Sequence, residues 1–454
     1  MRKPFAQAPG LIVAAPASGS GKTTLTLGLI AALVQRGARV RSFKIGPDYI
    51  DPAFHEAASG RPCLNLDPWA MRGSTLDALM AELSADAELL IGEGVMGLFD
   101  GAPDGTGSSA DLAARFALPI ILVIDASRQG ASVAAVAEGF ARHRGDVQLA
   151  GVVLNRVGSA NHEATLRHAL AATGIAVLGA VPRDEALALP SRHLGLVQAR
   201  EHVALTDFIA HAAETVARHV DLEALKRAAR APSTPSPLAG EGQGGGSREK
   251  LLEAIPIPPL GQHIAVARDD AFAFLYPHVL EAWRRHGVAI EFFSPLAEEA
   301  PAADCDAIYL PGGYPELHAG TLAAATRFMA GLRQAAARGA AIYGECGGYM
   351  VLGKELIDAK GAHHAMAGLL PLETSFAARK LHLGYRAVEL LADSPLGPKG
   401  ACFKGHEFHY ATIIGEGDGD ALFDVRDATG TSLGLIGQRA GRIFGSFAHL
   451  IDRV

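Results

Sequence analysis

The sequence predicts two α/β domains in tandem, each built on a largely parallel sheet. Three observations support this fold class. The chain has 454 residues, enough for two to three domains of about 150 residues. In both halves, short apolar runs alternate with helical patterns, as in parallel sheets covered on both faces. A Pro- and Gly-rich stretch separates the halves, so we expect domains at 1–230 and 261–454 and a linker at 231–260.

In the first domain, six apolar runs bounded by turn residues are expected to form strands. They cover 11–15, 39–45, 87–94, 119–125, 147–155 and 176–182. KTTLTLGLIAALVQRG (22–37) has the pattern of a helix between the first two. In the second domain, strands are expected within HIAVARD, VAIEFFSP, CDAIYLPGG and GAAIYGECGG, and the chain then becomes rich in strand patterns.

The predicted linker contains APSTPSPLAGEGQGGG (231–246), a composition that cannot bury apolar surface. The net charge of −7 and the pI of about 6.2 argue against an electrostatic nucleic-acid binder. No apolar run reaches the length of about 18 residues that spans a membrane. Four widely spaced cysteines without a CxxC pair indicate a reducing compartment, so we expect a cytoplasmic protein.

The segment GSGKTT (19–24) follows an apolar run and opens a helix, the context of a phosphate-binding loop. Its backbone N–H groups can point at phosphate oxygens, Lys22 can reach the β- and γ-phosphates, and Thr23 can offer a hydroxyl to Mg²⁺. Pro16 stands where the full motif has its first glycine. The sequence predicts ATP binding by Gly19, Ser20, Gly21, Lys22, Thr23 and Thr24.

Polar residues follow three later strands of the same domain, at the edge where ligands bind in such sheets. KIGPDYIDPAFH (44–55) carries Asp48 and Asp51, and IGEGVMGLFDG (91–101) carries Glu93. We expect Thr23, Asp48 and Glu93 to ligate Mg²⁺. Asn155, in VVLNRVGS, is expected to contact the adenine base, with turn capping as the alternative role.

GECGG (344–348) lies between an apolar run and a helical pattern, like a nucleophile elbow. The glycines let the turn close around Cys346, and the following helix N-terminus is expected to lower the thiol pKa. LPGGYPE (310–316) ends the preceding strand, so the N–H groups of Gly313 and Gly347 are expected to form an oxyanion hole. A thiol nucleophile needs a base, which we assign to His449, with His406 and His409 as alternatives.

Together these motifs resemble the cobyrinic and hydrogenobyrinic acid a,c-diamide synthases of cobalamin biosynthesis. Matching strings run nearly from end to end and include APASGSGKTT, KIGPDYIDPAFH, NLDPW, EGVMGLFDG, VVLNRVGS, LPGGYPEL, GECGGYMVLG, LGYR, GHEFHYA and GSFAHL. The resemblance implies an N-terminal P-loop NTPase domain like dethiobiotin synthetase. It also implies a C-terminal domain like class I glutamine amidotransferases.

The resemblance further implies a carbon–nitrogen ligase that takes ATP, Mg²⁺, L-glutamine and a tetrapyrrole polycarboxylate. One domain would convert a carboxylate into an acyl phosphate, and the other would release ammonia from glutamine at Cys346 and His449. The loop Asp48, Tyr49, Ile50 and Asp51 would lie near the substrate. Arg41 and Lys44 are further candidates to bind its carboxylates, and a homodimer is expected.

Class I amidotransferases usually carry His-x-Glu, but the residue two after His449 is Ile451. The family branch that this chain resembles manages with a Cys–His pair. What orients the imidazole is therefore open, with Glu407 as one possibility.

The sequence argues against three other functions. A partitioning-type P-loop switch would carry a second lysine where this chain has Ala17. Cobyric acid synthase amidates other side chains, and the strings KIGPDYIDP and EGVMGLFDG favour the a,c enzyme. A cysteine hydrolase fused to an unrelated kinase does not fit an end-to-end resemblance. The sequence leaves the choice between a cobalt-containing and a metal-free substrate open, as well as the order of amidation.

Overall fold

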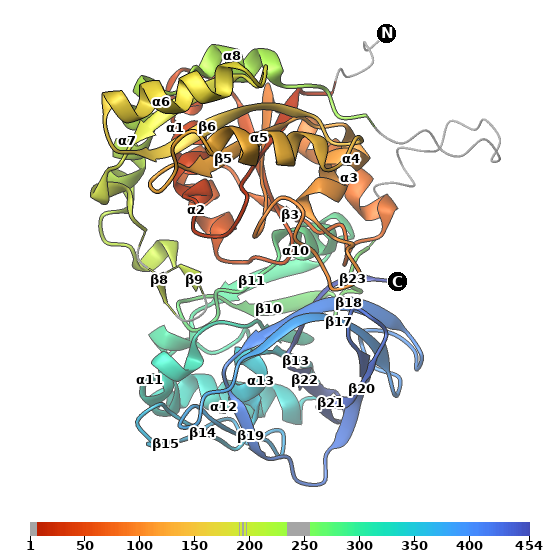
Figure 1. Cartoon of the computed structure of the whole chain (residues 1–454). Helices are drawn as coiled ribbons and strands as arrows, with labels where there is room; N and C mark the ends of the chain where they lie inside the picture. The colour runs from red at the N-terminus through yellow and green to blue at the C-terminus, as the bar shows by residue number, and fades with distance from the viewer. Residues whose placement is uncertain (1–6, 190, 193–194, 197, 234–254) are drawn as a thin grey trace, which may run out of the picture. The chain divides into compact units, whose positions relative to one another are not determined.

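The computed structural model describes residues 7–189, 191–192, 195–196, 198–233 and 255–454. The chain divides into two compact units (Figure 1). The first unit holds residues up to 254 except Ala70–Arg72, and the second holds Ala70–Arg72 and Ile255–Val454. Most of the predicted linker, residues 234–254, lies outside the described residues.

The first unit is built on a parallel seven-stranded sheet with the order β3-β2-β4-β1-β5-β6-β7. Its strands are β1 (Gly10–Ala14), β2 (Val40–Ile45), β3 (Leu64–Leu66), β4 (Leu89–Glu93), β5 (Ile120–Asp125), β6 (Leu149–Val157) and β7 (Val177–Pro182). The six predicted strands are confirmed. The sequence did not reveal β3, because its three residues are too few to show a pattern.

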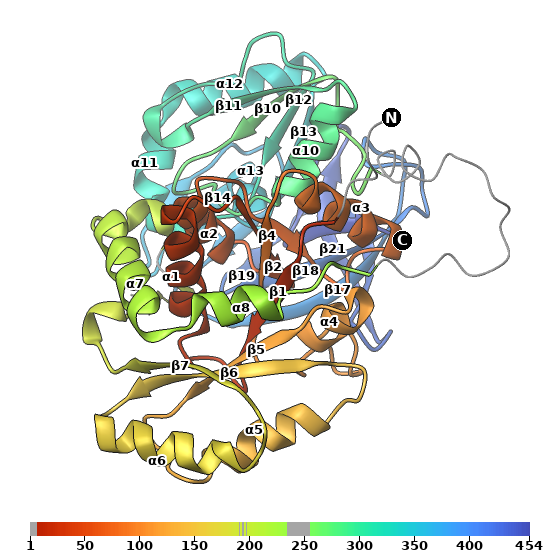
Figure 2. The same cartoon turned by 90° about the horizontal axis from the view of Figure 1, so that it is seen from above.

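Helices cover both faces of this sheet. They are α1 (Lys22–Gln35), α2 (Asp51–Ser59), α3 (Gly73–Ser84), α4 (Ser109–Phe116), α5 (Val133–Arg142), α6 (Ala160–Ala171), α7 (Leu205–His219) and α8 (Leu222–Ala228). Figure 2 shows α5 and α6 on one face, and α1 and α7 on the other. A short hairpin of β8 (Ser191–Arg192) and β9 (Gly195–Leu196) precedes α7. The carboxyl edge of the sheet is left for loops.

The second unit contains a ten-stranded sheet with the order β11-β10-β12-β13-β22-β21-β20-β17-β18-β23. The first five strands run parallel, and the others pair antiparallel. The strands are β10 (His263–Ala267), β11 (Ala289–Phe293), β12 (Ala307–Leu310), β13 (Ala341–Glu345), β17 (His382–Leu390), β18 (Cys402–His409), β20 (Asp420–Arg426), β21 (Ser432–Ala440), β22 (Ile443–Ser446) and β23 (Ala448–Arg453). The predicted α/β class and the strand-rich C-terminal part are confirmed.

A smaller sheet and four helices complete this unit. The sheet is formed by β14 (Glu355–Ile357), β15 (His363–Ala365), β16 (Glu373–Ser375) and β19 (Thr412–Gly415). The helices are α10 (Pro277–Arg285), α11 (Ala319–Ala324), α12 (Thr326–Ala337) and α13 (Gly347–Leu352). Within the ranges that the structure describes, no helix has the length and apolar character needed to cross a bilayer.

Candidate active site

The loop after β1 has the backbone shape of a phosphate cradle. Gly19 and Gly21 adopt left-handed φ angles of 79° and 85°, which cost glycine little and other residues much. At Gly21 a Cβ would also lie 2.1 Å from Asn155 Nδ2. Ser20 Oγ donates to the carbonyl of Ala17 at 2.8 Å, which holds the loop closed. The N–H groups that follow sit at the start of α1, where the helix dipole favours an anion.

Glu93 lies at the centre of the polar groups behind this loop, and it is fully buried. Its Oε1 accepts from Thr23 Oγ1 at 2.7 Å and from Lys44 Nζ at 2.8 Å. Its Oε2 lies 2.7 Å from His55 Nε2, and Lys22 Nζ is 3.4 Å from Oε1. Lys44 and Glu93 are opposite each other in register on β2 and β4, which explains why their side chains meet.

The two acids that follow β2 have different roles. Asp51 pairs with Lys44, and its Oδ2 lies 3.4 Å from Thr23 Oγ1. Asp48 instead accepts from the backbone N–H groups of Ile50 and Asp51 through one oxygen, at 2.8 and 3.0 Å. Its other oxygen lies 3.9 Å from Lys44 Nζ. The structure therefore brings Asp51 closer to Thr23 than the predicted ligand Asp48.

The charged groups in this cluster shift one another's pKa values. Burial would raise the pKa of Glu93, but Lys44, Lys22 and His55 lower it well below its usual value. Burial and neighbouring Asp48 raise the pKa of Asp51 to about 6, although Lys44 opposes them. Burial would lower the pKa of His55, but Cys63 and Glu93 raise it to about 10. These shifts favour a protonated His55 next to an ionised Glu93.

The residues predicted to contact the substrate do not all lie at the carboxyl edge of the sheet. Tyr49 and Ile50 are mostly buried in the turn before α2. Lys44, a candidate for binding substrate carboxylates, is buried between Asp51 and Glu93. The other candidate, Arg41, lies near the start of β2, away from the carboxyl edge, and pairs with Asp86 at 3.0 Å. The structure therefore does not bring Arg41 to the phosphate loop.

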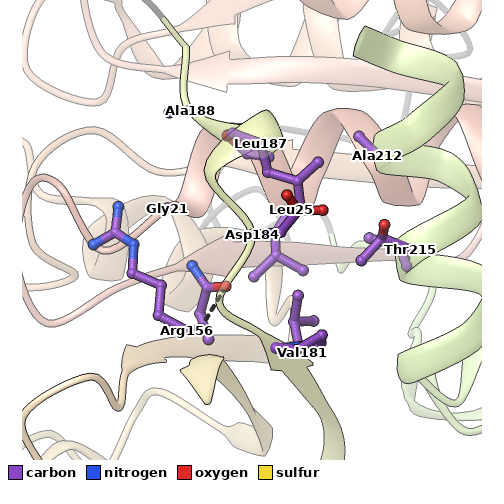
Figure 3. Close-up of a pocket in the computed structure, with 13 residues that line it drawn as sticks. Gly21, Leu25, Arg156, Val181, Asp184, Leu187, Ala188, Ala212 and Thr215 are labelled. Carbon is purple, nitrogen blue, oxygen red and sulfur yellow. Dashed lines mark hydrogen bonds between the residues drawn. The ribbon is translucent and has the colours of Figure 1, made fainter. Parts of the chain in front are cut away.

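A pocket of about 510 Å³, including its open mouth, adjoins the phosphate loop (Figure 3). It is lined by Gly21, Thr24, Leu25, Asn155, Arg156, Val181, Pro182, Asp184, Leu187, Ala188, Ala212, Thr215 and Val216. Asn155 Nδ2 donates to the Ser20 carbonyl at 2.9 Å, so the predicted base contact also supports the loop. The lining beyond β7 and on α7 was not predicted, because no motif marks those residues.

In the second unit, Cys346 stands at a sharp turn between β13 and α13. Its φ of 46° and ψ of −104° are strained for a non-glycine residue, as expected of a nucleophile elbow. Its N–H donates to the Ser446 carbonyl at 2.8 Å. A Cβ at Gly348 would lie 1.9 Å from the Leu310 carbonyl oxygen, so the elbow packs directly on β12.

The expectation that the helix N-terminus lowers the thiol pKa of Cys346 is wrong. Cys346 is 2% exposed, and burial, reinforced by Glu316, raises its pKa well above the ordinary value. The Gly347 N–H does lower it, but α13 has six residues and cannot outweigh burial. Burial therefore favours the protonated form of the thiol.

The glycines after β12 pack against this elbow. A Cβ at Gly347 would lie 3.0 Å from the backbone nitrogen of Gly313, so the two predicted oxyanion donors are close together. A Cβ at Gly312 would lie 3.0 Å from His449 Nε2 and 3.3 Å from Cys346 Cβ. His449 and Cys346 therefore contact the same glycine, and only a glycine leaves room for both.

The alternative bases lie on the neighbouring strand β18. His406 pairs in register with His449, and burial and His449 lower its pKa to about 3. His409 stacks on Phe447 with ring centroids 3.8 Å apart, and its Nε2 lies 2.9 Å from Glu407. Neither is the histidine against Gly312, so the geometry favours His449 as the base.

Family models match both units. Residues 11–197 match the CobQ/CobB/MinD/ParA nucleotide binding domain, and residues 263–453 match the CobB/CobQ-like glutamine amidotransferase domain. These matches support nucleotide binding in the first unit, as predicted.

Several curated proteins that are similar over nearly the full chain share the name hydrogenobyrinate a,c-diamide synthase. The protein from Brucella anthropi is 58% identical over 445 residues, 98% of each chain. That from Rhizobium meliloti is 56% identical over 98% of this chain and 99% of its own. That from Rhodobacter capsulatus is 54% identical over 97% and 98%.

The Glu93 cluster makes a prediction about stability. Lys44→Met would leave Asp51 and Glu93 buried without their shared cation, so we expect a loss of about 3–5 kcal/mol in the free energy of unfolding. Arg41→Met, three residues earlier on β2, breaks a pair with the half-exposed Asp86 and should cost less than about 1 kcal/mol. Urea unfolding followed by Trp69 fluorescence, in a Trp283→Phe background, reports on the first unit. Equal midpoints for the two variants would contradict this account.

Proposed function

The chain belongs to the hydrogenobyrinate a,c-diamide synthase family, and from this we propose that it amidates the a and c carboxylates of hydrogenobyrinic acid with ATP and glutamine. One observation carries the proposal. A phosphate loop backed by Glu93 occurs in the same chain as a cysteine elbow whose Cys346 lies against the same glycine as His449. The relatives' shared name favours the metal-free substrate over cobyrinic acid. A partitioning-type switch would leave Cys346 without a role.

In the first unit, a substrate carboxylate would attack the γ-phosphorus of ATP. The new P–O bond gives an acyl phosphate, and the bond to ADP breaks. The N–H groups of residues 19–21 and the Lys22 ammonium would hold the phosphates as negative charge moves to the leaving oxygen. The loop 48–51 ends β2 at the same edge of the sheet, which supports a role in placing the carboxylate. The pocket lined by Asn155 would accept the adenosine.

The residues behind the loop fit Mg²⁺. Three hard oxygen donors gather here, since Thr23 Oγ1 lies 2.7 Å from Glu93 Oε1 and 3.4 Å from Asp51 Oδ2. Thr23 and Glu93 would hold the ion with Asp51, while Asp48 would keep the turn before α2 in place. When bound, Mg²⁺ neutralises the charge of the phosphate oxygens.

In the second unit, the thiol proton of Cys346 would pass to His449 Nε2 as sulfur bonds to the γ-carbonyl carbon of glutamine. The N–H groups of Gly313 and Gly347 would stabilise the oxyanion. The imidazolium then protonates the leaving nitrogen, and ammonia departs as the C–N bond breaks. Water hydrolyses the thioester in the same way and releases glutamate.

Ammonia would then attack the acyl phosphate, so that a C–N bond forms while phosphate leaves and a proton is lost. Each amide would therefore use one ATP and one glutamine, and two rounds would give the diamide. A cytoplasmic location and a homodimer stay predictions.

Two variants separate the two halves of this reaction. Cys346→Ala should lose glutamine-dependent amidation but still amidate hydrogenobyrinic acid with added ammonium, because the phosphate loop is intact. Lys22→Met should lose amidation with either nitrogen source, because phosphoryl transfer fails. Mass spectrometry measures the two OH-to-NH₂ replacements, with cobyrinic acid tested in parallel. If the wild-type chain amidates neither tetrapyrrole, the proposed function is wrong.

The contact between Gly312, Cys346 and His449 gives a sharper test. In Gly312→Ala the new Cβ would lie 2.3 Å from His449 Cε1, so the imidazole must move. We expect glutamine-dependent amidation to fall by about 10²-fold and ammonium-dependent amidation to be unchanged. Gly320→Ala is the control, because its Cβ would meet His364 at an ordinary 3.7 Å. A Gly312→Ala enzyme that uses glutamine like Gly320→Ala would contradict the assigned geometry.

A further inference from the structure

We propose that Glu345, the residue immediately before the nucleophile, positions His449 and stabilises its protonated form. It would replace the acid that class I amidotransferases carry two residues after the histidine, where this chain has Ile451. The inference rests on the proposed glutamine hydrolysis and assigns an additional residue to it. Glu345 touches no reacting atom in this role, so it is a positioning residue.

The first observation is the position of the Glu345 carboxylate. Its Oε2 lies 3.6 Å from His449 Nδ1, an ion-pair distance, and both side chains are at most 3% exposed. Its Oε1 accepts from the Leu450 N–H at 3.1 Å. One carboxylate therefore faces the imidazole and also binds the backbone of the next residue, so it restrains both the ring and the strand that carries it.

The second observation is that the carboxylate cannot easily turn away. Tyr309 Oη donates to Oε2 at 2.7 Å, and Tyr343 Oη donates to Oε1 at 2.9 Å. Burial and the charge of Glu345 raise the pKa of both phenols well above the usual value, so they remain donors. Two hydroxyls and one N–H thus fix a buried carboxylate against His449.

The path of the chain explains this meeting. β13 and β22 run parallel with Glu345 and Ser446 in register. The chain then turns at Phe447 into β23, which carries His449. His449 therefore returns to the carboxyl end of β13, where Glu345 and Cys346 are adjacent in sequence. With Nδ1 toward Glu345, Nε2 is the nitrogen nearer Gly312 and the elbow.

Glu407, the acid considered from the sequence, is engaged elsewhere. Its carboxylate accepts from Arg386 Nε at 2.6 Å and lies 2.9 Å from His409 Nε2. Burial would raise its pKa, but His409 and Arg386 lower it to about 2. In strand register it lies opposite Ala448, with His406 opposite His449. The geometry thus assigns the orienting role to Glu345.

The test compares Glu345→Gln with Tyr343→Phe, Glu345→Asp and wild type. Glutamate release is measured against pH in the presence of ATP, Mg²⁺ and hydrogenobyrinic acid. Ammonium-dependent amidation shows that the first unit is intact, and the fluorescence of the buried Trp283, in a Trp69→Phe background, reports on the folding of the second unit. Glu345→Gln keeps the shape but removes the charge, so we expect kcat/KM for glutamine to fall roughly 10²-fold. Ammonium-dependent amidation should remain.

The pH profile separates positioning from structural support. The groups facing His449 are Glu345 from β13, Cys346 from the elbow and His406 from β18. In Glu345→Gln a protonated imidazole has lost its counter-ion. The acid limb of the pH profile of kcat/KM for glutamine should therefore move about one pH unit lower than in wild type. Tyr343→Phe keeps the Glu345 carboxylate, so its acid limb should stay at the wild-type pH. Glu345→Asp also carries a carboxylate, so its acid limb should lie at the wild-type pH and not at the lower pH of Glu345→Gln.

The outcomes are distinguishable. The inference is overturned if Glu345→Gln has the wild-type kcat/KM for glutamine. It is also overturned if kcat/KM falls while the acid limb of the pH profile stays where it is in wild type. If wild type releases no glutamate from glutamine, the proposed function fails instead.

Discussion

The burial of one carboxylate, Glu93, constrains the whole phosphate site. An ionised carboxylate removed from water costs on the order of several kcal/mol unless it is paired and hydrogen-bonded. Here the end of β4 places Glu93 where Lys44 from β2, His55 from α2 and Thr23 from α1 can all reach it. The same contacts that stabilise the charge hold β2, α2 and the start of α1 against the end of β4, next to the loop. Stability and phosphate chemistry therefore depend on the same group.

The second unit uses a related arrangement. Glu345 ends the parallel strand β13, as Glu93 ends β4, and each buried carboxylate lies at the carboxyl edge of its sheet. The partners differ because the chemistry differs. Around Glu93 the cationic side chains of Lys44, Lys22 and His55 lower the pKa of the carboxyl group. Around Glu345 two phenols and a backbone N–H leave one face of the carboxylate toward His449.

Much of this could be predicted from the sequence. Apolar runs between helical patterns identified the two α/β units, and glycine-rich motifs at strand ends identified the loop at Lys22 and the elbow at Cys346. Such patterns show which residues end a strand, and these gather at one edge of a parallel sheet. The family resemblance favoured His449 over His406 and His409 as the base, although His449 lies far from Cys346 in the chain.

The rest depends on register and burial, which spacing does not encode. Asp51 rather than Asp48 lies next to Thr23, because the Asp48 side chain turns back onto backbone N–H groups. The thiol pKa of Cys346 is raised, because full burial outweighs a short helix. No pattern in the sequence marked Glu345, since nothing in the sequence shows that β23 returns to it.

The claim that the first unit phosphorylates a substrate carboxylate can be tested directly with ¹⁸O. Hydrogenobyrinic acid labelled in its carboxyl oxygens would be converted with ATP and glutamine, and the released phosphate analysed by mass spectrometry. The account predicts that each amide formed is accompanied by one phosphate carrying one ¹⁸O, because the carboxyl oxygen leaves with the phosphoryl group. Amide formation with unlabelled phosphate would contradict it.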